Sequence, residues 1–114
     1  MARAKYTGPE DRLSLYEAVV DTIDGLDRKG AANPYTSVNG YMTSFIDNEG
    51  SVGLRLDPTA RAEFLELYGS RIAVQYGKEM KEFAVVPDEL LERTGELSGW
   101  FQRGFDWVRT LKPK

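Results

Sequence analysis

The chain has 114 residues, and none of them is cysteine or histidine. Without cysteine it can form no disulfide and can offer no thiolate as nucleophile or metal ligand. Without histidine it lacks the commonest general base and the commonest metal ligand. We identify no catalytic, cofactor-binding or metal-ligating residues and expect no cofactor. The sequence therefore favours a protein that is not an enzyme.

Long apolar runs are also absent, and this argues against a membrane-spanning segment, which needs about 20 apolar residues. The start of the chain lacks the apolar core of a secretory signal. A net charge of −3 argues against direct binding to nucleic acid, which relies on a basic surface. The hydrophobic content of 41% fits a folded chain. We expect one cytoplasmic domain over residues 1–114, with residues 1–7 flexible.

The central feature of the sequence is the segment 34–57, which predicts a three-stranded antiparallel meander. The Asn-Gly pair at 39–40 is typical of a two-residue type I′ turn, because both central residues of that turn need a positive φ. This turn makes Val38 and Tyr41 cross-strand neighbours. A second tight loop, with a glycine in the left-handed position, is predicted at 47–51.

The alternation of side chains assigns the meander two different faces. The first face is apolar and should be covered by helices; it carries Ser37, Met42, Ser44, Ile46, Val52, Leu54 and Leu56. The second face is amphipathic and should meet solvent; it carries Val38, Tyr41, Thr43, Phe45, Gly53 and Arg55. An antiparallel sheet can leave one such face open to water.

The rest of the chain predicts helices that cover this sheet, together with two more strands. Pro58 after the capping residue Asp57 is the clearest helix start, and Gly69 is a suitable stop. The expected elements are helices at 9–26, 58–68, 87–93 and 94–111 and strands at 71–76 and 81–86, with a turn at 77–79. This α-β-β-β-α-β-β-α order, with a short helix before the last one, indicates an α+β fold: a two-layer α/β sandwich with an antiparallel sheet.

The last helix has the strongest amphipathic pattern of the chain. A glycine at position 104 on its apolar stripe indicates close approach to another backbone, for which the sheet is the expected partner. Two interpretations of its aromatic residues remain open, a stacking platform for bases or a ligand ring and ordinary core packing. The spacing of three and four favours the core. The aromatic residues concerned are Trp100, Phe105 and Trp107.

Two charged clusters each have two interpretations. The carboxylates of Glu17, Asp21 and Asp24 could bind a divalent cation, but a solvated helix face is the simpler interpretation because helical carboxylates alone supply few preorganised oxygens. The cations of the tail 109–114 could contact nucleic acid, although cations also suit the C-terminus of any helix. We favour the structural interpretation in both cases.

Three parts of the sequence together resemble the TfoX N-terminal-domain-like (Sxy-like) family. They are the meander segments 39–42 and 53–56, the segment 80–87, and the ending 100–114. The resemblance implies an α-β(3)-α-β(2)-α order, as in the secretion-chaperone-like and YjbR-like proteins, and no established catalytic residues. The chain departs from the family at 33–37, where many relatives have a glycine-rich start to the first strand.

Two functional hypotheses follow. The first is a non-enzymatic protein-interaction or regulatory module that binds a protein partner or a second copy of itself, because aromatic residues with arginine are enriched at interfaces. Its candidate partner-binding residues are Val38, Tyr41, Thr43, Phe45 and Arg55. The second is a small-molecule or anion-binding domain with its site near the first hairpin, where Arg55 would supply the cation. Its candidate ligand-binding residues are Asn33, Tyr35, Ser37 and Asn39.

Overall fold

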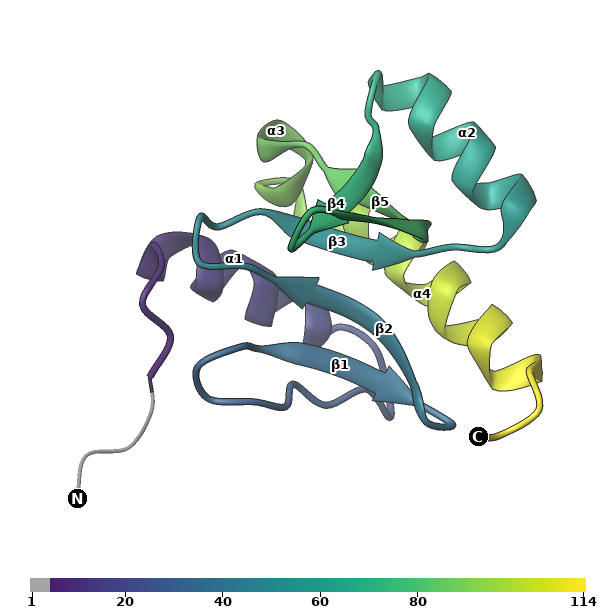
Figure 1. Ribbon diagram of the computed structural model, residues 1–114, viewed down its shortest axis with the longest axis horizontal. Coiled ribbons are helices and arrows are strands. Elements are labelled where there is room, and N and C mark those ends of the chain that lie inside the picture. The colour runs from purple at the N-terminus through teal and green to yellow at the C-terminus, as the bar shows by residue number, and fades with distance from the viewer. Residues whose placement is uncertain (1–4) are drawn as a thin grey trace.

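The computed structural model describes residues 5–114, and a five-stranded antiparallel sheet forms its centre (Figure 1). The strands are β1 (Tyr35–Val38), β2 (Tyr41–Ile46), β3 (Val52–Arg55), β4 (Ile72–Gln75) and β5 (Lys78–Val86), in the order β1-β2-β3-β5-β4. The helices are α1 (Glu10–Val20), α2 (Pro58–Tyr68), α3 (Asp88–Leu91) and α4 (Thr94–Thr110). These elements confirm the predicted α+β fold and its element order. Of residues 1–7, predicted to be flexible, residues 1–4 lie outside the described residues.

The main core lies between the sheet and the helices α1, α2 and α4. It is made by the buried side chains of Tyr16, Val19, Val52, Leu54, Leu56, Phe64, Leu97, Phe101 and Phe105. Helix α4 rests directly on the sheet, because a Cβ atom at Gly104 would lie 2.5 Å from the carbonyl oxygen of Arg55. The predicted close approach at this glycine is therefore confirmed.

The aromatic residues of α4 belong to the core and its border. Phe105 is 7% exposed and buried within the core. Trp100 is half-buried at the core's edge, where its ring meets Phe64 edge-on at 5.2 Å and its Nε1 donates to the Tyr68 hydroxyl. Trp107 is half-buried as well. These positions favour the packing interpretation over the stacking platform.

The ends of the first two helices show how local chemistry sets their limits. The Asp57 side chain accepts a hydrogen bond from the Ala60 backbone N–H at 3.1 Å, and α2 ends at Gly69 with a φ of 59°, as predicted. Helix α1 ends earlier than predicted, at Val20. Beyond it, backbone bonds span only three residues, yet Ile23 and Leu26 still enter the core.

A β-bulge in β2 changes which side chains share a face. Thr36 pairs with Ser44 and Ser37 pairs with Met42, so that Thr43 is an extra residue without a partner in β1. Such an insertion shifts the alternation of all residues on one side of it. The face assignment predicted for the start of β2 and the end of β1 is therefore wrong.

The corrected positions separate the predicted partner-binding residues. Val38 packs against the main core, and Thr43 is only 3% exposed, with its hydroxyl 2.6 Å from that of Thr36. The Tyr41 hydroxyl donates to the carbonyl oxygen of Lys112 in the C-terminal tail at 2.9 Å. Met42 instead packs beside Phe45 on the opposite face.

A buried hydroxyl network ties α1 to the sheet. The Tyr16 hydroxyl lies 2.7 Å from Ser44 Oγ, which lies 2.6 Å from Thr36 Oγ1. Tyr16 is fully buried, and this burial raises the pKa of its phenol well above the usual range, although the hydrogen bonds to Ser44 and Thr36 oppose the rise. The folded protein thus holds this proton more tightly than the unfolded chain does.

This raised pKa predicts a loss of stability at alkaline pH. The protonated phenol of Tyr16 contributes fully to the free energy of unfolding below pH 10, which is the ordinary pKa of tyrosine. This contribution is lost as the pH rises further. Urea denaturation followed by circular dichroism should show a shallower alkaline loss in Tyr16→Phe. Tyr76→Phe, at an exposed position, serves as the control and should match the wild type. Equal alkaline slopes in all three proteins would contradict the prediction.

Candidate functional site

The hairpin β4–β5 bends over the sheet face opposite α1 and α4, and it lies on the viewer's side in Figure 1. The bend arises in β5, whose second half pairs with β3. Its pairing with β4 shifts from Ile72↔Ala84 to Ala73↔Met80, so that residues 81–83 have no partner in β4. A bulge of this kind increases the twist of a strand and turns it out of the plane of the sheet.

The tip of the hairpin is a two-residue turn formed by Tyr76 and Gly77. Both residues have a positive φ, of 54° and 77°, as a type I′ turn requires. The turn predicted at 77–79 is therefore placed one residue too late. Tyr76 is 95% exposed, and a bulky side chain rarely adopts this backbone conformation.

The strain at Tyr76 predicts that this residue can be replaced with a gain in stability. Tyr76→Asn should raise the free energy of unfolding by about 1 kcal/mol, because asparagine tolerates the left-handed region far better. Urea denaturation measures the change, with Tyr76→Phe as the control that keeps the strain. If Tyr76→Asn is no more stable than Tyr76→Phe, the turn is not strained at this position.

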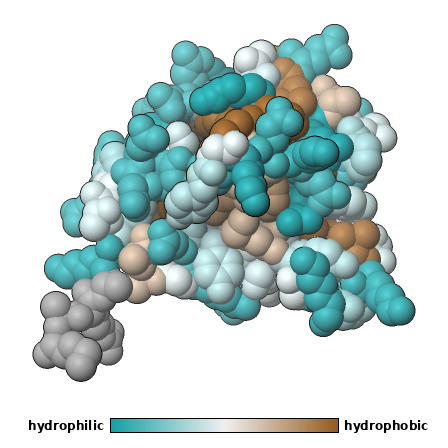
Figure 2. All heavy atoms as spheres, in the orientation of Figure 1, coloured by the Kyte–Doolittle hydropathy of each residue, from teal (hydrophilic) through white to brown (hydrophobic). Residues whose placement is uncertain are grey.

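An open groove of about 730 Å³ lies between the bent hairpin and the first two strands, and we call it the sheet groove. Its apolar lining consists of Pro34, Tyr35, Met42, Phe45, Val74, Tyr76 and Met80. Its polar lining consists of Asn33, Asp47, Asn48, Glu49, Gln75, Lys78 and Glu79. Figure 2 views the molecule from the hairpin side, where apolar surface is visible between hydrophilic side chains. The volume lies within the usual range of binding sites.

A second, smaller cluster of apolar side chains fixes the floor of the sheet groove. The Phe45 ring packs on Phe83 at a centroid distance of 5.6 Å. The same ring lies over Gly53, where a Cβ atom would collide with it. Met42 and Met80 are half-buried beside this pair. The floor thus combines a fixed aromatic ring with two flexible thioether side chains.

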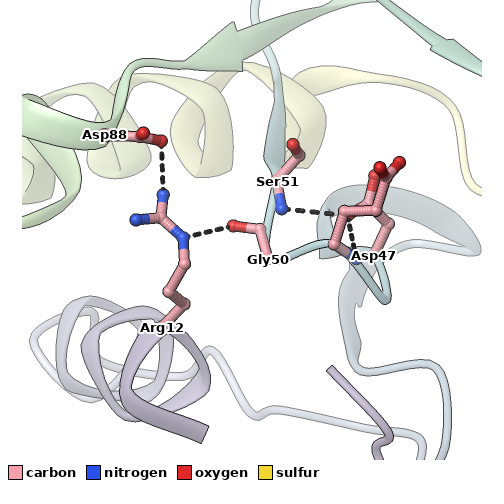
Figure 3. A network of polar contacts seen from close by, with 6 residues as sticks. Arg12, Asp47, Gly50, Ser51 and Asp88 are labelled. Carbon is pink, nitrogen blue, oxygen red and sulfur yellow. Dashed lines mark hydrogen bonds and ion pairs between the residues drawn. The ribbon is translucent and has the colours of Figure 1, made fainter. Parts of the chain in front are cut away.

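Asp47 closes one end of the sheet groove by joining the β2–β3 turn to the hairpin. Its Oδ1 accepts hydrogen bonds from the backbone N–H groups of Glu49 and Ser51, each at 2.9 Å (Figure 3). Its Oδ2 accepts a hydrogen bond from Gln75 Nε2 at 3.2 Å. One carboxylate therefore shapes the turn and also contacts the opposite wall.

Arg12 of α1 supports the same turn from behind. Its Nε donates to the Gly50 carbonyl oxygen at 2.8 Å, and its terminal nitrogen donates to Asp88 at 2.7 Å (Figure 3). The turn is thereby fixed to α1 and to the start of α3. We expect this end of the sheet groove to keep its shape when a ligand binds.

The sheet groove brings together only part of the two predicted sets of site residues. Asn33 and Tyr35 from the ligand-binding set and Phe45 from the partner-binding set all line it. The Ser37 hydroxyl accepts a hydrogen bond from Lys29 Nζ at 2.9 Å. The Asn39 amide donates, at 3.4 Å, to carbonyl oxygens at the end of α4.

The Arg55 guanidinium, predicted as the cation of an anion site, contacts groups of the protein itself. Its Nε donates to the Met42 carbonyl oxygen at 2.7 Å, and its terminal nitrogen pairs with Glu82. Its guanidinium also lies over the Phe83 ring, 4.7 Å from the centroid. These contacts join β3 to the start of β2 and to β5.

Of the three carboxylates predicted to form an acidic ridge, Glu17 lies on α1, whereas Asp21 and Asp24 follow its end at Val20. Glu17 pairs with Arg28 at 2.8 Å. Within residues 5–114, no group of three or more acidic side chains is placed to hold a metal ion. No helix in the described part of the chain is both long and apolar enough to cross a membrane.

Comparisons with protein families, curated proteins and solved structures found no match for this chain.

Proposed function

We propose that the protein is a non-enzymatic interaction module, with an adaptor or regulatory role, that holds an apolar segment of a protein partner in the sheet groove. The observation that carries this proposal is the apolar floor of Met42, Phe45 and Met80, which remains open beside the bent hairpin. Methionine side chains adapt to ligands of different shape. Aromatic residues and methionine are also enriched at protein interfaces.

The exposed side chains at the hairpin support a protein partner. Tyr76 is 95% exposed and Val74 is 54% exposed, and both border the sheet groove. Burying such a side chain stabilises a complex by about 1.5–3 kcal/mol. A partner segment in the groove could cover both residues and the floor together.

A small-molecule binding domain is the second candidate, and the groove volume of about 730 Å³ supports it. Arg55, Ser37 and Asn39 contact other groups of the protein, and this favours an apolar ligand over an anion. The favoured ligand is a largely apolar molecule bound on the methionine floor. Such a molecule would raise the midpoint of thermal unfolding in a metabolite screen.

We also propose that the protein belongs to the TfoX N-terminal-domain-like family and is located in the cytoplasm. The α-β(3)-α-β(2)-α order agrees with the fold that the resemblance implies. The family has no established catalytic residues, in keeping with a binding role. A second copy of this chain is a further protein that could occupy the groove.

A peptide selection tests the proposed function. Peptides selected on the wild-type protein from a random displayed library should bind Met80→Glu at least tenfold more weakly, because the variant puts a carboxylate on the apolar floor. The matched control is Leu67→Glu, which makes the same kind of change at a 66% exposed position on α2. Fluorescence polarisation with the labelled peptide measures both affinities.

Three results would contradict the proposed function. One is the failure of the selection to enrich any peptide. Another is equal binding to Met80→Glu and the wild type. The third is an equal loss of affinity in Leu67→Glu, since the binding surface would then extend to α2. Thermal unfolding of both variants ensures that any loss of binding does not reflect loss of the fold.

A further inference from the structure

We infer that the partner segment is cationic as well as apolar, with lysine or arginine flanking an apolar anchor. This inference rests on the proposed function, because it concerns the occupant of the same sheet groove. It adds a chemical class that the apolar floor alone does not specify.

Carboxylates outnumber cations along the sheet groove. Asp47, Glu49 and Glu79 line it, whereas Lys78 is the cation among its lining residues. The ion pairs found within residues 5–114 involve neither Glu49 nor Glu79, and both residues are exposed. A cationic segment would therefore meet complementary charge, and an acidic one would meet repulsion.

The position of Asp47 makes this charge a fixed feature of the groove. Its carboxylate is held by two backbone N–H groups and by the Gln75 amide, so it stays at the closed end. A lysine or arginine that follows an anchor on Met42 and Phe45 could extend toward this end. Phosphate groups would face the same carboxylates, which argues against a nucleic-acid occupant.

The aromatic rings of the groove provide a second reason for a cationic occupant. Tyr35, Phe45 and Tyr76 line it from three different segments, and aromatic faces attract lysine and arginine side chains. Tyr76 keeps its exposed ring in spite of an unfavourable backbone conformation at the hairpin tip. Strain of this kind is concentrated at functional sites. We assign Tyr76 the role of covering the bound segment.

Two synthetic peptides with a shared apolar core test the inference. The core holds a tryptophan between leucines, and the flanking residues are lysines in one peptide and glutamates in the other. Fluorescence polarisation with the wild-type protein should show at least tenfold tighter binding of the lysine-flanked peptide. A few ion pairs of modest strength between its lysines and the groove carboxylates are enough for this difference. Tyr76→Asn should weaken that peptide's binding severalfold although the hairpin itself is relieved of strain.

Charge-neutralising variants show whether the groove carboxylates cause the preference. The double variant Glu49→Gln with Glu79→Gln should reduce the advantage of the lysine-flanked peptide several-fold. The double variant Glu66→Gln with Glu92→Gln changes the net charge equally at exposed positions that do not line the groove. This control should keep the wild-type preference, because distant charges are screened by salt.

The outcomes separate the inference from the proposed function. Equal binding of both peptides, with binding lost in Met80→Glu, would leave the groove as the binding site and overturn the cationic partner. Tighter binding of the glutamate-flanked peptide would overturn it as well. A preference that both double variants reduce equally would reflect net charge and not the groove. If neither peptide binds while the selection enriches peptides that depend on Met80, the inference is overturned and the proposed function stands.

Discussion

Arg55→Ala is expected to lower the free energy of unfolding by about 2–4 kcal/mol. The side chain is only 17% exposed, and its loss leaves the Met42 carbonyl oxygen and Glu82 without their partner. The Phe83 ring, which lies beneath the guanidinium, would also lose its cover. This ring supports Phe45 in the floor of the sheet groove. Urea denaturation followed by circular dichroism measures the loss.

Arg103→Ala is the matched control for this prediction. Arg103 also pairs with a glutamate and lies over an aromatic ring, but its side chain is 45% exposed. Its removal should cost no more than about 1 kcal/mol, as exposed ion pairs contribute little. Equal costs for the two variants would show that Arg55 does not hold the bulged strand against β3.

The second large effect is expected at the contact between α4 and the sheet. Gly104→Ala should destabilise the protein by about 1–3 kcal/mol, because the added Cβ atom would lie 2.5 Å from the backbone oxygen of Arg55. The helix would have to move away from the core to accept it. Alanine is otherwise the better residue in a helix interior, by up to about 1 kcal/mol.

Gly99→Ala on the same helix provides a control with the opposite sign. A Cβ atom at Gly99 would meet nothing within 4 Å, so only the gain in helix propensity remains. We expect Gly99→Ala to be more stable than the wild type by up to about 1 kcal/mol. If Gly104→Ala is stabilised to the same degree, α4 does not lie against the sheet as described.

The fold could be predicted from the sequence because its signals are local. The Asn-Gly turn between Val38 and Tyr41 forms as expected, with left-handed φ values of 55° at Asn39 and 84° at Gly40. Asp57 and Gly69 mark the ends of α2 through cap chemistry, which depends on neighbouring residues alone. The apolar spacing of α4 indicates the buried face of that helix directly.

The faces of β2 could not be predicted in the same way. Alternation assumes that each residue has one partner, and nothing local in the sequence reveals that Thr43 is left out of the pairing. The single insertion turns Met42 to the groove and brings Val38 to the core. The buried hydroxyl of Thr36 then satisfies that of Thr43 and also bonds Ser44, which is a tertiary effect.

The site itself was predicted only in part. Tyr35 and Phe45 were identified from their composition and strand position, but Met80 and Tyr76 were missed. Their contribution depends on the bend in β5, which folds the hairpin back over the sheet. A tyrosine followed by glycine between Gln75 and Lys78 was the available signal, since it fits a two-residue turn with an unusually bulky first residue.

Methyl NMR of the methionine side chains tests the central claim most directly. The chain has three methionines, and two of them, Met42 and Met80, line the sheet groove. On addition of a peptide selected on the wild-type protein, we expect both methyl signals to shift together and to saturate at the affinity that fluorescence polarisation gives. Saturable binding with both of these signals unchanged would show that the partner occupies another surface, and would contradict the account.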